Sequence, residues 1–127
     1  MPRLPLASCL LMAACATPLD RPLTPYTSRV IEVAPGAPYE KCVPLQTGDR
    51  LLFSYQADPP MSFGILRRVG DATLSYILRD ASREDSGIFF VAAAENYCLH
   101  WDPVATDTIW PTLLRFTIQL NQATDKP

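Results

Sequence analysis

Apolar and polar residues alternate one by one along much of this sequence, and this period of two constrains the fold more than any other feature. It is clearest at residues 51–56, 61–66 and 113–120, where large apolar side chains occupy every second position. Successive side chains of a β-strand point to opposite faces of a sheet, whereas one face of an α-helix repeats every three to four residues. The alternation therefore predicts half-buried strands and an all-β fold.

Turn signals rich in Pro, Gly and Asp interrupt the alternation, among them Asp-Pro-Pro at 58–60 and Glu-Asp-Ser-Gly at 84–87. We expect about eight short strands, at residues 29–33, 41–45, 50–56, 61–66, 73–79, 88–94, 97–102 and 113–120. This spacing is typical of an antiparallel β-sandwich, here jelly-roll-like with about seven or eight strands. Residues 88–94 contain no polar side chain, which favours a central strand covered on both faces, with a buried helical turn as the alternative.

Residues 1–14 have the composition of an export signal rather than of a folded element. Arg3 is followed by a mostly apolar run that ends in small side chains directly before Cys15. Such a run after a positive charge is the pattern of a signal peptide. It is too short to cross a bilayer as a mature helix, which takes about 20 apolar residues. We expect it to be removed after export.

The residues around the expected cleavage site resemble a bacterial motif. Met-Ala-Ala-Cys at 12–15 is similar to the lipobox, whose cysteine receives a diacylglycerol and becomes the mature N-terminus. The resemblance implies lipidation of Cys15 and attachment to the membrane through that lipid. Ala16, rather than Asp, after the cysteine implies sorting to the outer membrane. Leu-Ala-Ser-Cys at 6–9 offers Cys9 as an alternative, and an ordinary secretory signal is a third interpretation.

A proline-rich stretch at residues 15–26 separates the signal from the folded part. Pro18, Pro22 and Pro25 disfavour helix and favour extended backbone. We therefore expect a tether there, a β-sandwich domain at residues 27–121 and a polar tail at residues 122–127. The total length of 127 residues excludes a multi-domain enzyme.

Of the 4 cysteines, Cys42 and Cys98 belong to the expected domain. An even pair in an exported protein favours a disulfide, because the compartments outside the cytosol are oxidising. Such a bridge would stabilise the domain by about 4 kcal/mol in the chain-entropy model. Free buried thiols and a metal site are the alternatives, but two cysteines and a single histidine make a poor zinc site. We expect no metal and no cofactor.

The order of motifs in the domain resembles that of the GOLD domain, a β-sandwich of cargo receptors and of some lipid-transfer proteins. The similarity lies in Tyr-Cys-Leu-His-Trp-Asp at 97–102, then a loop and the alternating strand 113–120. Upstream it includes Ala-Pro-Gly at 34–36, Cys-Val-Pro-Leu at 42–45, Gly-Asp at 48–49 and Met-Ser-Phe-Gly-Ile at 61–65. The resemblance implies a GOLD-like, non-enzymatic sandwich that presents loops or a sheet face to a partner.

The charge balance excludes a surface for nucleic acid. The chain has 11 basic and 13 acidic residues and a net charge of -2, whereas proteins that bind nucleic acids carry excess Lys and Arg to neutralise phosphates. Asp80, Glu84 and Asp85 form an acidic cluster that we interpret as a solvated turn. A Ca²⁺ loop is the alternative, although the regular spacing of such loops is missing.

The single histidine, His100, is the residue around which acid–base catalysis could be organised. It shares a strand face with Asp102, and the pair could polarise a hydroxyl such as Ser54 or Ser75. The chain would then be a small periplasmic hydrolase or carbohydrate-active enzyme. The competing interpretation is a histidine at the sheet edge that hydrogen-bonds to a neighbour. We assign no catalytic residue and keep His100 and Asp102 as candidate binding residues.

The two tryptophans have different expected positions. Trp101 alternates in phase with Tyr97 and Leu99, so we expect it in the core. Trp110 lies in a polar loop before Pro111, where it is either an interface anchor or a side chain folded back over the end of the sandwich.

Together these features predict a lipid-anchored cell-envelope protein of non-enzymatic binding or structural type. We expect it on the bacterial outer membrane, facing the periplasm, or, without the lipid, soluble in the periplasm or secreted. Its expected partner is an envelope protein or a glycan. The candidate binding residues are Trp110, His100 and Asp102.

Overall fold

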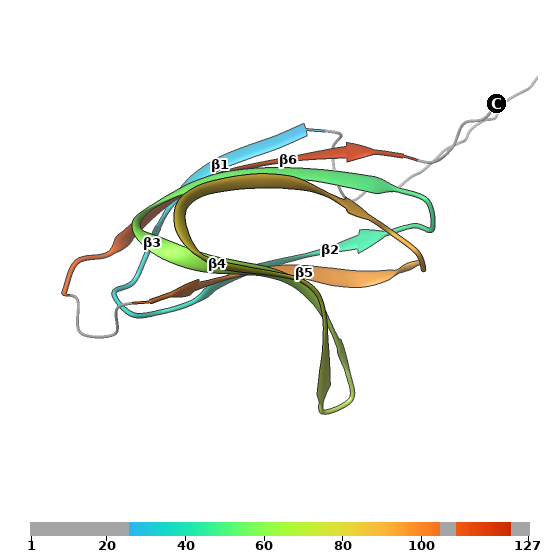
Figure 1. The fold of residues 1–127 in the computed structure, drawn as a ribbon, viewed down its shortest axis with the longest axis horizontal. Coiled ribbons are helices and arrows are strands. Elements are labelled where there is room, and N and C mark those ends of the chain that lie inside the picture. Colours follow the sequence, from blue (N-terminus) through green and yellow to red (C-terminus); the bar gives the residue numbers. More distant parts are fainter. Residues whose placement is uncertain (1–25, 105–108, 123–127) are drawn as a thin grey trace, which may run out of the picture.

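The computed structural model describes residues 26–104 and 109–122, which contain six antiparallel β-strands (Figure 1). The strands are β1 Tyr26–Val33, β2 Tyr39–Leu45, β3 Arg50–Val69, β4 Ala72–Phe90, β5 Glu95–Pro103 and β6 Thr112–Asn121. The predicted all-β antiparallel class is confirmed, because every strand pairing is antiparallel. In these residues no helix is long and apolar enough to span a membrane.

β3 is the central strand of a single curled sheet with the order β1-β6-β3-β5-β2. Its residues 50–58 pair with β6 and its residues 61–66 pair with β5, while β4 pairs with its other side along both parts. We call β1, β6, residues 50–58 of β3 and residues 84–90 of β4 the first half of the sheet. The second half consists of β2, β5, residues 61–69 of β3 and residues 72–79 of β4. The sheet curls so that the two halves face each other (Figure 1).

Residues 58–60, predicted as a turn, lie inside β3 instead. They occupy the point where β3 exchanges β6 for β5 as its neighbour, and the peptide bond between Asp58 and Pro59 is cis. Proline has no N–H to donate to a neighbouring strand, so sheets tolerate it where the ladder of hydrogen bonds is interrupted. The change of neighbour provides such an interruption for Pro59 and Pro60. The strands predicted at 50–56 and 61–66 are therefore one strand.

Residues 84–87, also predicted as a turn, lie inside β4, which follows β3 around the curl. Gly87 pairs with Phe53 and is required by packing rather than by a turn. A Cβ atom at Gly87 would lie 2.8 Å from Cζ of Phe53 and 2.9 Å from Nη2 of Arg79. The strands predicted at 73–79 and 88–94 are accordingly one strand, which ends at Phe90.

The predicted two-sided burial of residues 88–94 is wrong. Ile88 and Phe90 are 47% and 67% exposed, whereas Phe89 between them is 7% exposed. The reason is that the core lies on the inner face of the curled sheet, and β4 contributes Phe89 to it while Ile88 and Phe90 point outward. Only one of its faces meets the core. The alternative of a helical turn is not observed either, since residues 91–94 form an irregular connection.

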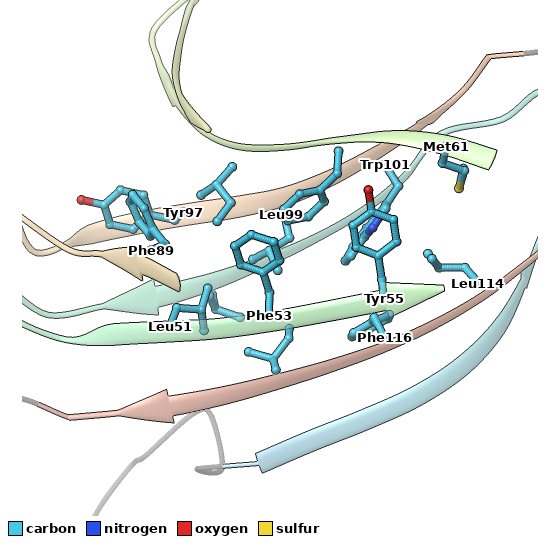
Figure 2. Packing of buried hydrophobic residues seen from close by; sticks show 14 of the residues in the cluster. Leu51, Phe53, Tyr55, Met61, Phe89, Tyr97, Leu99, Trp101, Leu114 and Phe116 are labelled. Carbon is cyan, nitrogen blue, oxygen red and sulfur yellow. The ribbon is translucent and has the colours of Figure 1, made fainter. Parts of the chain in front are cut away.

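The core lies between the two halves and is rich in aromatic side chains (Figure 2). Trp101 of β5 is 1% exposed, which confirms its predicted core position. The centroid of its ring lies 5.0 Å from that of Phe63 in β3 and 5.1 Å from that of Phe116 in β6. Aromatic side chains bury about 150–250 Å² each and dominate the energetics of a core. This stack therefore links the first half of the sheet strongly to the second.

Candidate functional site

The predicted pair of His100 and Asp102 lies on the outer face of β5, in the second half of the sheet. His100 Nε2 and Asp102 Oδ2 are 3.0 Å apart. The register places Glu40 of β2 directly opposite His100, and Oε1 of Glu40 lies 3.8 Å from Nδ1 of His100. Arg68 of β3 donates a hydrogen bond to Oε2 of Glu40. We call Glu40, Arg68, His100 and Asp102 the histidine cluster.

The histidine cluster can carry ion pairs, and the hydroxyl group beside it is that of Ser62 in β3, which stands opposite Asp102 and donates a hydrogen bond to its main-chain oxygen. The structure does not bring the two serines considered for catalysis to His100. Ser54 lies in the first half, opposite Thr117, and Ser75 lies opposite Leu66. Both ring nitrogens of His100 face carboxylates instead. A protonated His100 would therefore tie β2 to β5 electrostatically, an effect of at most about 1 kcal/mol for a pair near the surface.

The predicted disulfide between Cys42 and Cys98 is present and joins β2 to β5 beside the histidine cluster. The two cysteines are directly opposite each other, two residues along the strands from Glu40 and His100. The Sγ atoms and a carboxylate oxygen of Glu40 lie within 4.8 Å of one another. Metals bind the thiolate form of cysteine, which a disulfide does not provide. These three residues would offer a metal site only after reduction.

The acidic residues considered for a Ca²⁺ loop do not form one, because they lie within β4. Glu84 and Asp85 are neighbours on a strand and so point to opposite faces of the sheet. Asp85 accepts two hydrogen bonds from Nη1 of Arg79, each 3.0 Å long. Its carboxylate is thus engaged on the inner side of the curl.

Tyr55 lies opposite Asp85 and points into the core (Figure 2). Burial is the main reason why the pKa of Tyr55 is raised to about 12; the carboxylate of Asp85 raises it as well, and Arg79 acts in the opposite direction. The Oη atom of Tyr55 is buried and has no hydrogen-bond partner within the described residues. Tyr55 is therefore neutral at physiological pH and contributes to packing rather than to acid–base chemistry.

Trp110 is 69% exposed, so most of its side chain is accessible to solvent. Val104, Ile109 and Leu113, close to it in the chain, are 56%, 77% and 49% exposed. We call these four residues the distal surface. Ile109, Trp110 and Leu113 lie around the start of β6, which pairs with the end of β1, and Val104 directly follows the end of β5.

A row of hydroxyl groups that the sequence pattern does not reveal lies on the outer face of the first half. Ser28, Thr117, Ser54 and Ser86 stand opposite one another on four adjacent strands. Alternation could show that each of them points away from the core, but not that they are aligned. Their alignment depends on the register between strands that are far apart in the sequence.

Cys9, Cys15 and the expected tether up to residue 25 lie outside the described residues, as do residues 123–127 of the expected tail. Their proposed roles therefore stay predictions. Comparison with models of known protein families finds none that matches the chain, and comparison with curated proteins finds no similar sequence.

Proposed function

We propose that the chain is a lipid-anchored protein of the bacterial cell envelope whose β-domain is a non-enzymatic binding module. The signal-like residues 1–14 and the lipobox-like position of Cys15 support export and anchoring, with the outer membrane, facing the periplasm, as the proposed location. The disulfide between Cys42 and Cys98 is consistent with an oxidising compartment.

The observation that carries the proposal is the position of the distal surface, whose exposed tryptophan lies far from the start of the sheet. The sheet begins at Tyr26, which pairs with Gln119, whereas the distal surface lies at the other end of the same strands. A strand of eight residues such as β1 spans roughly 25 Å. If the preceding residues tether the chain through Cys15, the distal surface points away from the membrane.

The composition of the distal surface suits a protein partner. Tryptophan is the residue type most enriched among those that dominate binding energy at interfaces. In the distal surface Trp110 is accompanied by the exposed aliphatic side chains of Val104, Ile109 and Leu113. We infer that this end of the sheet contacts another protein of the envelope.

We also propose that the curled sheet is a GOLD-like sandwich whose two layers are the first and second halves. Support comes from the contact of Trp101 with Phe116 between the halves and from the motif order around residues 97–102. An experimental structure with two facing layers would agree with this proposal, and one open, flat sheet would contradict it.

The anchor is tested by fractionating cells that produce the wild-type chain or its Cys15→Ser variant. Wild-type protein should be in the membrane fraction and Cys15→Ser protein in the soluble periplasmic fraction, because the acyl chains are lost. Cys9→Ser is the matched control and should stay with the membrane. Membrane-bound Cys15→Ser protein would contradict the assignment, and release of Cys9→Ser would move the lipid to Cys9.

The distal surface is tested by crosslinking in intact cells and purification of the tagged chain. Trp110→Ala should abolish most crosslinking to a partner protein, since loss of a dominant interface residue costs about 2 kcal/mol or more. Tyr26→Ala is the matched control, because Tyr26 is a 61% exposed aromatic residue at the other end of the sheet. Equal crosslinking by both variants would refute the assignment of this surface.

The 3.0 Å contact between His100 and Asp102 favours a second candidate function, a small periplasmic hydrolase or carbohydrate-active enzyme. Under the binding proposal His100→Ala protein keeps its fold and supports every cellular phenotype of the wild type. A folded His100→Ala protein that loses the phenotype would favour the enzyme instead.

A further inference from the structure

A groove crosses the outer face of the first half, away from the histidine cluster. Its floor consists of the small side chains of Ser54, Ser86 and Thr117 on three adjacent strands. Ser28 continues this row onto β1, and its Oγ lies 3.3 Å from Oγ1 of Thr117. Two adjoining depressions of about 480 Å³ and 360 Å³ share the floor. We call this feature the hydroxyl groove.

Longer side chains form the two walls of the hydroxyl groove. They are Gln56, Glu84 and Arg115 on one side, and Leu52, Ile88 and Gln119 on the other. The first wall carries one positive and one negative charge, so it has no net charge. The second wall offers the aliphatic side chains of Leu52 and Ile88 beside an amide. A ligand that matches this groove has hydrogen-bonding edges, apolar faces and no net charge.

Sugar rings have this combination, with hydroxyl groups at their edges and C–H groups on their faces. A polyanion such as a nucleic acid would need an excess of positive charge, which the walls do not supply. A peptide in extended form would add to the edge of a sheet through its main chain rather than cross the face. The side chains of the hydroxyl groove therefore favour a glycan over either of these partners.

The open ends of the hydroxyl groove favour a polymer over a single sugar. The row runs from β1 to β4, which are the outermost strands of this half, so a chain can extend past Ser28 and Ser86. Adjacent strands lie about 4.8 Å apart, so the four hydroxyl groups cover roughly 14 Å. We propose that the hydroxyl groove binds a strand of neutral cell-wall glycan laid across the four strands. The surface differs from the one proposed to bind a protein, and the choice of cell-wall glycan rests on the proposed location in the cell envelope.

The test is co-sedimentation of the full chain, purified in detergent, with cell-wall sacculi from which protease has removed proteins. Wild-type protein should sediment with the sacculi. Ser86→Leu should fill the groove and reduce the affinity about tenfold or more, which corresponds to about 1.4 kcal/mol. Ser75→Leu is the matched control, because Ser75 is also an exposed serine of β4 but lies in the second half, opposite Leu66. It should bind as the wild type does.

Thr117→Val is the second variant, since it replaces a hydroxyl by a methyl group of nearly the same shape. Loss of one hydrogen bond should weaken binding by about 3- to 10-fold without changing the melting temperature measured by circular dichroism. The proposal is overturned if wild-type protein does not sediment, or if Ser86→Leu, Thr117→Val and Ser75→Leu all bind like the wild type.

Two further experiments separate the glycan proposal from binding to a single short sugar chain and from the proposed protein-binding function. A soluble hexasaccharide of N-acetylglucosamine should compete with the sacculi for the protein. Protein that binds the hexasaccharide but does not bind sacculi would overturn the assignment to a polymer. Cys15→Ser and Trp110→Ala protein should both sediment with sacculi like the wild type. Failure of the glycan proposal and failure of the anchored protein-binding function are thus distinguishable.

Discussion

The outer faces of the two halves of the sheet are built differently. In the second half, the disulfide between Cys42 and Cys98 joins the neighbouring strands β2 and β5, and the contact of Glu40 with Arg68 joins β2 to β3 across β5. In the first half the central outer row consists of short hydroxyl side chains. The hydroxyl groups are exposed or partly exposed, and even the contact of Ser28 with Thr117 on the adjacent strand can be exchanged for hydrogen bonds to a ligand. The second half is therefore reinforced at its surface, while the first half leaves its hydroxyl groups accessible.

The largest effect should come from the core residue that both halves share. Trp101→Ala removes the ring that lies between Phe63 and Phe116 and leaves a cavity. We expect the free energy of unfolding to fall by up to about 5 kcal/mol. Because the ring contacts both halves, unfolding by urea, followed by circular dichroism, should still show one transition. Two separate transitions would show that the halves are stable independently.

The next largest effect should come from removing the disulfide that only the second half contains. The double variant Cys42→Ala with Cys98→Ala avoids a reactive single thiol and should lose about 4 kcal/mol of stability. Amide hydrogen exchange should accelerate most in β2 and β5, because the bridge joins these strands. A loss below about 1 kcal/mol would mean that the bridge does not reinforce this half.

A third effect on the free energy of unfolding should appear only at high pH, and it comes from Tyr55 on the inner face of β3. The pKa of Tyr55 is raised from 10.0 to about 12 in the folded chain. The unfolded chain therefore loses the phenol proton first, so stability should decrease as pH rises from 10.0 to about 12.

Urea midpoints measured across this range test the effect, with Tyr55→Phe as the control variant. The decrease should be smaller in Tyr55→Phe. It should not vanish, because burial also raises the pKa of Tyr97. An unchanged decrease in Tyr55→Phe would exclude Tyr55 as its cause.

The smallest effect should come from a single surface contact. Glu40→Gln weakens the contacts with Arg68 and His100 and should cost about 0.5 kcal/mol, with a smaller difference at high salt. Ser28→Ala is the matched variant in the first half, and it should lower the free energy of unfolding by no more than Glu40→Gln does. If Glu40→Gln costs more than about 2 kcal/mol, the histidine cluster supports the second half more than a surface pair does.

Features decided by a single strand could be predicted from the sequence. Alternation within one strand determines which residues share a face, so it placed Trp101 in the core and His100 beside Asp102. The disulfide followed from the number of cysteines in the domain. These features require no knowledge of which strands are neighbours.

Features that depend on neighbouring strands could not be predicted in this way. Glu40 lies opposite His100 through the register of β2 on β5, and Arg68 of β3 reaches Glu40 through its side chain, although the three residues are distant in the sequence. Pro59 and Pro60 have the composition of a turn, yet they continue a strand because β3 changes neighbours there. The alignment of the four hydroxyl groups also depends on the register between neighbouring strands, which alternation within one strand does not determine.

The ion pair of Arg79 and Asp85 has a consequence for how copies of this protein behave beside one another. β4 pairs only with β3 in residues 26–104 and 109–122, so its free edge offers a long row of backbone groups to another strand. Inward-pointing charges on an edge strand discourage such addition, because the new strand would strip water from the ion pair. The pair thereby protects against edge-to-edge aggregation, which matters most where copies are concentrated in two dimensions.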